Sequence, residues 1–217
     1  MIRRNILRTV VLGFLVALAG CAGLSPSPIR TVPMSEVRSR CEMSPLATEP
    51  IEQQLNAYWK LTPYIPICSV DRIKEGFGGV YIHNVKMPAD AIKNRMVVIS
   101  RYHGGSTNGY DFWMGDIGRY ILAHEYGHAA QANAPRPDTW KAPVYPLKPA
   151  SFYRTHGVTR QATLTEADAD CRAGAFLAAQ GWRTVPPAVE RYILRYQEDT
   201  THPDARVRLA IVKECLQ

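Results

Sequence analysis

The segment His124-Glu125-Tyr126-Gly127-His128 constrains the fold of this chain more than any other part of the sequence. Residues four apart on a helix lie on one face, about one turn from each other, so both imidazoles can reach a single ion. Apolar residues precede the segment at helical spacing and extend the same stripe: Ile117, Tyr120 and Ile121. We therefore predict a helix from about Asp116 to Gln131 or Ala132.

The pattern HExxH on a helix is a signature of zinc hydrolases, in which the two histidines bind zinc. The intervening glutamate, here Glu125, acts as the general base. Catalytic zinc needs a third protein ligand and leaves an open position for water. The candidates downstream are two histidines and three acidic residues: His156, His202, Glu166, Asp168 and Asp170.

One arrangement of the third ligand is excluded by the residues that follow the motif. In HExxHxxGxxH sites a glycine and a third histidine continue the same segment, whereas this chain has Gln131 and Ala134 at those positions. We therefore expect the third ligand to be a carboxylate from another helix.

The segment from Thr165 to Gly174, TEADADCRAG, resembles the second motif of gluzincin peptidases, Glu-x-x-x-Asp. Together with the HExxH segment, it is similar to the bacterial neutral zinc metallopeptidase family, and more distantly to thermolysin and to the CaaX prenyl protease type. The match covers roughly residues 117 to 180. The resemblance implies that Glu166 is the third zinc ligand and that Asp170 orients a zinc histidine. Helical spacing agrees, since residues four apart share a face.

A weaker resemblance concerns the residue that stabilises negative charge on the substrate. Residues His202-Pro203 and the later Arg208 are similar to the His-Pro pair and arginine that follow the metal site in the prenyl protease type. Four side chains are eligible by type for this role: His202, His156, Tyr153 and Arg208. We expect His202 to fill it, with a surface or capping histidine as the alternative.

The N-terminus has the features of an export signal. Three arginines precede an apolar run from Val10 to Ala19, which is short for a membrane span. The tetrapeptide Leu-Ala-Gly-Cys that ends at Cys21 resembles the lipobox of bacterial lipoproteins, which implies cleavage before Cys21 and lipid attachment to it. We therefore expect a signal peptide at 1–20, a lipidated tether at 21–34 and one domain at 35–217. The expected location is the cell envelope, at the periplasmic face of the outer membrane.

Charge and cysteine content are consistent with this location. Removing the three leader arginines lowers the formal net charge from +7 to +4, which requires no nucleic-acid partner. Cys41, Cys68, Cys171 and Cys215 remain after Cys21, and an even number of cysteines suits a compartment that permits disulfides. Of the three possible connectivities we predict Cys41 with Cys68 and Cys171 with Cys215, and buried free thiols are the alternative.

Other elements follow from periodicity and from turn residues. We predict a helix at 50–61, short strands at 80–82 and 96–99, and a loop at 101–115. The proline-rich segment 133–153 is interpreted as an ordered flap or a packed surface loop. A second helix should start near Thr165, whose spacing to Asp168 suits a capping box, and end at Gly181. Two more helices are expected at 187–197 and 203–215.

These features together predict an α+β protein, with a mainly helical zincin-like domain in which the HExxH helix packs on the ExxxD helix beside a small β-sheet. The predicted function is a zinc-dependent metallopeptidase that acts on proteins or peptides of the cell envelope. Two alternatives stay open: a zinc amidase that acts on cell-wall peptides, and a non-catalytic binding or assembly lipoprotein. Substrate specificity and oligomeric state are not indicated by the sequence.

Overall fold

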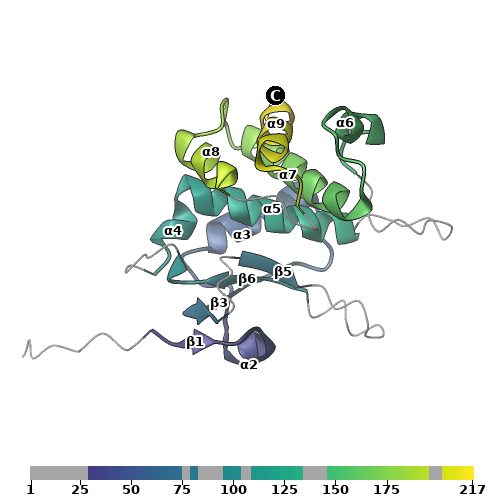
Figure 1. Cartoon of the computed structure of the whole chain (residues 1–217). Coiled ribbons are helices and arrows are strands. Elements are labelled where there is room, and N and C mark those ends of the chain that lie inside the picture. The colour runs from purple at the N-terminus through teal and green to yellow at the C-terminus, as the bar shows by residue number, and fades with distance from the viewer. Residues whose placement is uncertain (1–28, 75–78, 83–94, 104–108, 134–145, 196–201) are drawn as a thin grey trace, which may run out of the picture.

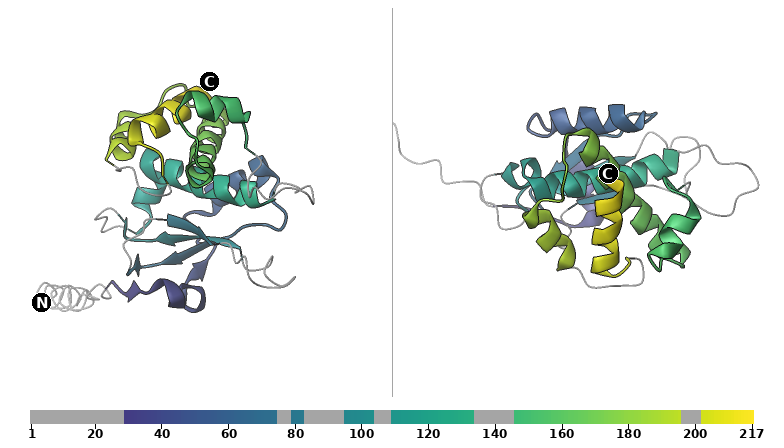
Figure 2. Two further views of the ribbon diagram at one scale, coloured as in Figure 1. Left: turned by 45° about the vertical axis from the view of Figure 1, so that its right-hand side comes forward. Right: turned by 90° about the horizontal axis from the view of Figure 1, so that it is seen from above.

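The structure is a computed structural model that describes residues 29–74, 79–82, 95–103, 109–133, 146–195 and 202–217. It is a mainly helical α+β fold, as predicted. Helix α5 (Asp116–Asn133) lies between two layers, with the sheet beneath it and the C-terminal helices above it, as both side views show (Figures 1 and 2). Helix α3 (Glu49–Trp59) runs along one side of the molecule (Figure 2, right).

The larger sheet within the described residues has the strand order β2-β3-β6-β5. Strand β3 pairs in parallel with β6, while β2 and β5 pair in the antiparallel sense with β3 and β6 respectively. All residues of the two central strands are buried, which suits the β-branched run Val97-Val98-Ile99 of β6 and the β-branched ends Ile67 and Val70 of β3. These strands are β2 (Glu42–Met43), β3 (Ile67–Val70), β5 (Gly79–Ile82) and β6 (Met96–Ser100).

A second, two-stranded sheet joins β1 (Thr31–Val32) in parallel to β4 (Arg72–Ile73). Strand β1 lies in the range that the sequence assigns to the tether. It is followed by a short 3₁₀ turn (Met34–Glu36) and by α2 (Val37–Arg40), which cover the face of the larger sheet opposite α5.

The main hydrophobic core lies between the larger sheet and the helices. Side chains of β3, β6, α3 and α5 meet there with residues of the C-terminal helices, and Trp113, Tyr126 and Phe176 are among its fully buried members. Because α5 contacts the sheet on one side and α7 on the other, its apolar residues extend around much of the helix. The HExxH segment is therefore held in the middle layer of the molecule.

The remaining helices confirm most of the predicted elements. The predicted helix at 50–61, the two predicted strands and the two C-terminal helices all form within a few residues of the expected bounds. Besides α3 and α5, the helices of the upper layer and the connecting segments are α4 (Asp111–Met114), α6 (Ala150–Thr155), α7 (Gln161–Ala179), α8 (Pro187–Leu194) and α9 (Ala205–Cys215).

Two predictions about local structure were wrong. Helix α4 lies within the segment expected to be a loop, where Trp113 is fully buried against the core and its indole donates to the Ser100 carbonyl oxygen at 2.8 Å. Helix α7 begins at Gln161 rather than near Thr165, so Thr165 and Asp168 are internal residues and form no capping box. The flap interpretation concerns residues that lie largely outside the described part, except that 150–155 form α6.

The predicted cysteine pairing is confirmed. One disulfide joins Cys41 to Cys68 beside β3, and the other joins Cys171 of α7 to Cys215 of α9. Two disulfides indicate an oxidising, extracytoplasmic compartment. Within the described ranges, none of the helices has the length and apolar character needed to cross a membrane.

Candidate metal centre

The candidate metal centre forms where α5 crosses α7. Gly127 allows this close approach: a Cβ atom at this position would lie 3.1 Å from the carbonyl oxygen of Ala169 and 3.2 Å from its Cα atom. The turns of α5 on either side of Gly127 carry His124 and His128, and α7 presents Glu166 to both. The predicted packing of the HExxH helix on the ExxxD helix is therefore confirmed.

Three donor atoms converge at this crossing. The Nε2 atoms of His124 and His128 are 3.2 Å apart, and Oε2 of Glu166 lies 3.2 Å from the first and 3.3 Å from the second. Ligand atoms around a tetrahedral zinc ion at about 2.0–2.1 Å are separated by about 3.3–3.4 Å. The spacing thus fits a small divalent cation. Among the residues that the structure describes, this is the one cluster of histidine, cysteine and acidic side chains that could hold a metal.

The charges around the centre favour a cation. Burial alone would lower the pKa of His124, but the carboxylates of Asp170 and Glu166 outweigh burial and raise it to about 10. Burial would likewise raise the pKa of Glu166, but the neighbouring imidazoles of His124, His128 and His202 hold it well below its usual range. The carboxylates of Asp170 and Glu166 thus favour positive charge at the centre. A proton on His124 supplies this charge, and a metal ion bound by His124, His128 and Glu166 would supply it too.

Asp170 contacts His124 as the sequence predicts. Its Oδ1 atom accepts the Nδ1–H of His124 at 2.8 Å and the hydroxyl of Tyr120 at 2.6 Å, while Arg208 of α9 donates through Nε to Oδ2 at 2.8 Å. Burial would raise the pKa of Asp170, yet Arg208 and His124 keep it well below its usual range. Burial and Asp170 raise the pKa of Tyr120, so its hydroxyl keeps its proton and donates. With Nδ1–H held in this way, a neutral His124 turns the lone pair of Nε2 towards the centre.

Asp168 supports the centre through Gln131, a contact that the sequence analysis did not predict. It is fully buried and accepts hydrogen bonds from Gln131, Arg172 and Tyr153 and from the backbone N–H of Leu147. The amide of Gln131 in turn contacts His128, with Oε1 at 3.1 Å from Nδ1. The spacing of Gln131 three residues after His128 could have indicated this contact, because such residues are neighbours on a helix.

His202 also lies at the centre. Its Nε2 atom is 3.3 Å from Oε2 of Glu166, and its side chain is 31% exposed, which is more than for His124 or His128. Glu125 follows His124 on α5 and is partly buried. The structure therefore places His202, the side chain that the sequence analysis preferred among four candidates, next to the ligand set.

The three other candidates for stabilising the substrate's negative charge are engaged by acidic side chains other than Glu166. The imidazole of His156 pairs with Glu214, Nε2 to Oε1 at 3.3 Å, and packs on Phe152. The hydroxyl of Tyr153 is bonded to Asp168, and the guanidinium of Arg208 is bonded to Asp170. His156 is therefore not part of the ligand set.

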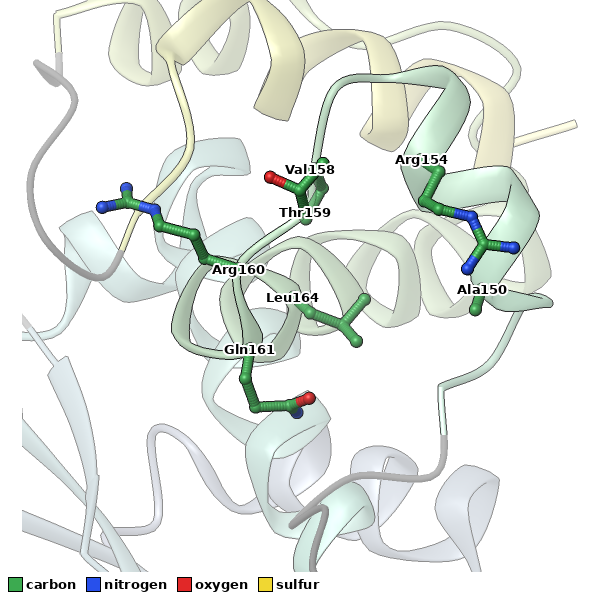
Figure 3. A pocket seen from close by; sticks show the side chains of 7 residues that line it. All are labelled: Ala150, Arg154, Val158, Thr159, Arg160, Gln161 and Leu164. Atoms are coloured by element: carbon green, nitrogen blue, oxygen red, sulfur yellow. The ribbon is translucent and has the colours of Figure 1, made fainter.

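A pocket of about 140 Å³ between α6 and the start of α7 is separate from the metal centre. Arg154 and Arg160 lie on opposite sides of it, with Leu164 between them, so the two guanidiniums do not converge on a common point (Figure 3). None of the candidate metal ligands lines this pocket.

Comparisons with known proteins gave no match to a protein-family model, to a curated protein or to a solved structure. The two motifs define a possible metal-binding centre of two histidines and one glutamate. The predicted lipid attachment at Cys21 lies outside the described residues.

Proposed function

We propose that this chain is a zinc-dependent metallopeptidase that hydrolyses peptide bonds in the bacterial cell envelope. The observation that supports the proposal most directly is the convergence of His124, His128 and Glu166 within 3.2–3.3 Å of one another. A zinc ion held there would lower the pKa of a bound water to about 7 and polarise a substrate carbonyl group. Three protein ligands, rather than four, are typical of catalytic sites.

Glu125 and His202 supply the remaining chemistry in this proposal. Glu125 accepts the proton of the attacking water on a carboxylate oxygen and transfers it to the nitrogen of the leaving amine. His202 donates its Nε2–H to the carbonyl oxygen as negative charge develops there. Its contact with Glu166 and its partial exposure support this role, since the group must reach both the centre and the substrate.

The position of β5 supports a peptide substrate. Strand β5 ends the order β2-β3-β6-β5, and no further strand pairs with it among the described residues. A Cβ atom on Gly79 would lie 3.3 Å from both Ile121 and Trp113, so the strand packs directly against the helix that carries the two histidines. An extended peptide can pair with such an end strand through its backbone, which would place its carbonyl groups beside α5.

We further propose that the chain acts in the cell envelope and that its N-terminal lipid binds it to the membrane. The two disulfides support an extracytoplasmic site of action, and the leader motif supports a lipid anchor at Cys21 on the periplasmic face of the outer membrane. No nucleic-acid partner is proposed. Mass spectrometry of the mature N-terminus tests the anchor, and a Cys21→Ala protein that still fractionates with membranes would count against it.

A zinc and hydrolysis assay tests the enzymatic proposal. In the purified full chain we expect one zinc per chain and cleavage of casein, with an activity that falls about 10²- to 10⁴-fold in Glu125→Gln while bound zinc is retained. Asp116→Asn, the same chemical change on an exposed carboxylate of α5, serves as the matched control. Cleavage of peptidoglycan fragments but not of casein would favour the amidase, and zinc without hydrolysis of either would favour a binding protein.

A further inference from the structure

The orientation of the Gln131 amide is determined by its surroundings. One end of the amide lies 2.8 Å from the carbonyl oxygen of Thr165 and 2.9 Å from Oδ2 of Asp168. Both of these atoms only accept hydrogen bonds, so the amide end that faces them must be the Nε2 donor. The other end, 3.1 Å from Nδ1 of His128, is therefore the Oε1 acceptor.

This orientation determines the tautomer of His128. An amide oxygen requires a donor, so Nδ1 of His128 carries the ring proton. A neutral imidazole has only one ring proton, which leaves Nε2 with a lone pair. That lone pair points at the atoms that complete the centre, Nε2 of His124 at 3.2 Å and Oε2 of Glu166 at 3.3 Å. His128 is thus prepared to bind a cation through Nε2.

Asp168 prevents the amide from turning round. Its carboxylate is fully buried, and Oδ2 also accepts from Nε of Arg172 at 2.8 Å. Oδ1 is bonded to the Tyr153 hydroxyl at 2.6 Å and to the Leu147 backbone N–H. Gln131 itself is only 4% exposed, so water cannot easily replace these partners. A flipped amide would place its oxygen against a carboxylate and a carbonyl group.

We propose that Gln131 is the positioning residue for His128, and that it sets the ring orientation and the Nδ1–H tautomer of this ligand with Asp168 holding the amide in place. The inference rests on the metal centre of the proposed function. It assigns to His128 a support that is separate from the Asp170 support of His124, and it gives the buried Asp168 a role in metal binding. Neither residue contacts the metal or the substrate in this proposal.

The alternative is that Gln131 only ties α5 to α7. Gln131→Met keeps the length of the side chain but removes the amide contacts with His128, Thr165 and Asp168. Gln180→Met is the matched control, because Gln180 is the exposed residue that directly follows α7. Three measurements separate the two roles. They are the zinc dissociation constant from chelator competition, the histidine tautomers of the metal-free full chain from long-range ¹H–¹⁵N NMR at mildly alkaline pH, and the Tm of the metal-free chain.

If Gln131 positions His128, zinc binding in Gln131→Met weakens about 10- to 100-fold, and the His128 Nδ1–H signature of the wild type is lost. A lower Tm with unchanged zinc affinity and an unchanged His128 tautomer would overturn the proposal. These outcomes are distinct from those of the hydrolysis assay. Zinc binding that depends on Gln131 without any hydrolysis leaves this inference standing and removes the peptidase, whereas hydrolysis with zinc binding that is indifferent to Gln131 does the reverse.

Discussion

Two aspartates of α7, Asp168 and Asp170, have closely matched surroundings and different connections to the metal centre. Each is fully buried, each accepts a tyrosine hydroxyl on Oδ1 at 2.6 Å, and each accepts an arginine Nε on Oδ2 at 2.8 Å. Asp170 contacts its histidine directly, at 2.8 Å from Nδ1 of His124. Asp168 reaches His128 only through Gln131. The comparison teaches that similar buried carboxylates can support two ligands of one centre by a direct and by a relayed contact.

The difference follows from the helix crossing. Residues two apart on a helix are separated by about 200° around its axis, so Asp168 and Asp170 leave α7 on nearly opposite sides. Ala169 lies between them, against Gly127 of α5. On one side of this contact α5 presents Tyr120 and His124, and on the other it presents His128 and Gln131. We call the contact of Asp170 with His124 the direct arm, and the contact of Asp168 with His128 through Gln131 the relayed arm. In the direct arm the aspartate pairs with Arg208 of α9, whereas in the relayed arm it pairs with Arg172, four residues further along α7.

The largest effect is expected from Asp170→Asn. Removing the charge leaves the buried guanidinium of Arg208 without its anion, which costs about 3–5 kcal/mol of unfolding free energy. The loss of the negatively charged partner of His124 should weaken zinc binding about 10- to 100-fold. Denaturant unfolding of the metal-free chain and chelator competition measure the two effects. Arg208→Met in the same background should cost less than it does alone, and strict additivity would contradict the pairing.

Low pH should reduce the contribution of Asp170 to the free energy of unfolding. The pKa of Asp170 in the folded chain lies below its ordinary value of 3.8, so the unfolded chain binds more protons as the pH falls below that value. The contribution of Asp170 to stability is therefore complete above pH 3.8 and is lost as the pH falls through the folded-state pKa. Unfolding of metal-free wild type and Asp170→Asn at decreasing pH should show the stability difference narrowing. A constant difference would mean that folding does not lower the pKa of Asp170.

Asp168→Asn should have the next largest effect. The new amide has one acceptor oxygen, so it cannot accept both from Gln131 and Arg172 on one side and from Tyr153 and the Leu147 backbone N–H on the other. Each donor left unsatisfied costs about 1–3 kcal/mol. Zinc binding should weaken less than in Asp170→Asn, because His128 keeps its own contact with Gln131. Chelator competition on both variants gives the ratio. A larger loss of zinc affinity in Asp168→Asn would reverse the order of the direct and relayed arms.

Gly127→Ala should affect both arms together. The added methyl group would press on Ala169 and on Cβ of Arg172 at 3.1–3.2 Å, which costs about 1–3 kcal/mol. A gain of about 1 kcal/mol in helix propensity offsets part of this cost. Because both histidine-bearing turns would shift relative to α7, zinc affinity should fall as well. Gly115→Ala, where the methyl group meets only ordinary contacts at 3.4 Å or more, should bind zinc as the wild type does.

The smallest effects come from the matched tyrosines. Tyr120→Phe and Tyr153→Phe should each cost about 0.5–1.5 kcal/mol of unfolding free energy, since each removes one buried hydrogen bond. Zinc affinity should fall only in Tyr120→Phe, because that hydroxyl shares Oδ1 of Asp170 with His124. Tyr153 bonds the Asp168 oxygen that faces away from Gln131. Equal changes in the two zinc dissociation constants would show that the two arms are not separate.

The sequence by itself determined what depends on short-range spacing. Periodicity placed the helices and central strands. The i, i+4 spacing put His124 with His128, and Glu166 with Asp170, on shared helix faces. The order of these elements along the chain was also enough to predict the two disulfide pairs. The sequence favoured His202 over His156 only through the weak resemblance carried by His202-Pro203 and Arg208, since both are isolated histidines with little local pattern. It also interpreted Asp168 as a capping residue from a spacing that occurs equally inside a helix.

Only the tertiary structure decided which faces meet. Gly127 lets α5 approach the backbone of α7, and Gly174 lets α7 approach Val212 of α9, where a Cβ atom would lie 2.7 Å from the carbonyl oxygen. These two contacts bring Arg208 to Asp170 and Gln131 to Asp168, across separations of 38 and 37 residues. Such partners leave no local periodicity in the sequence, because they depend on the packing of whole helices rather than on the turn in which each residue lies.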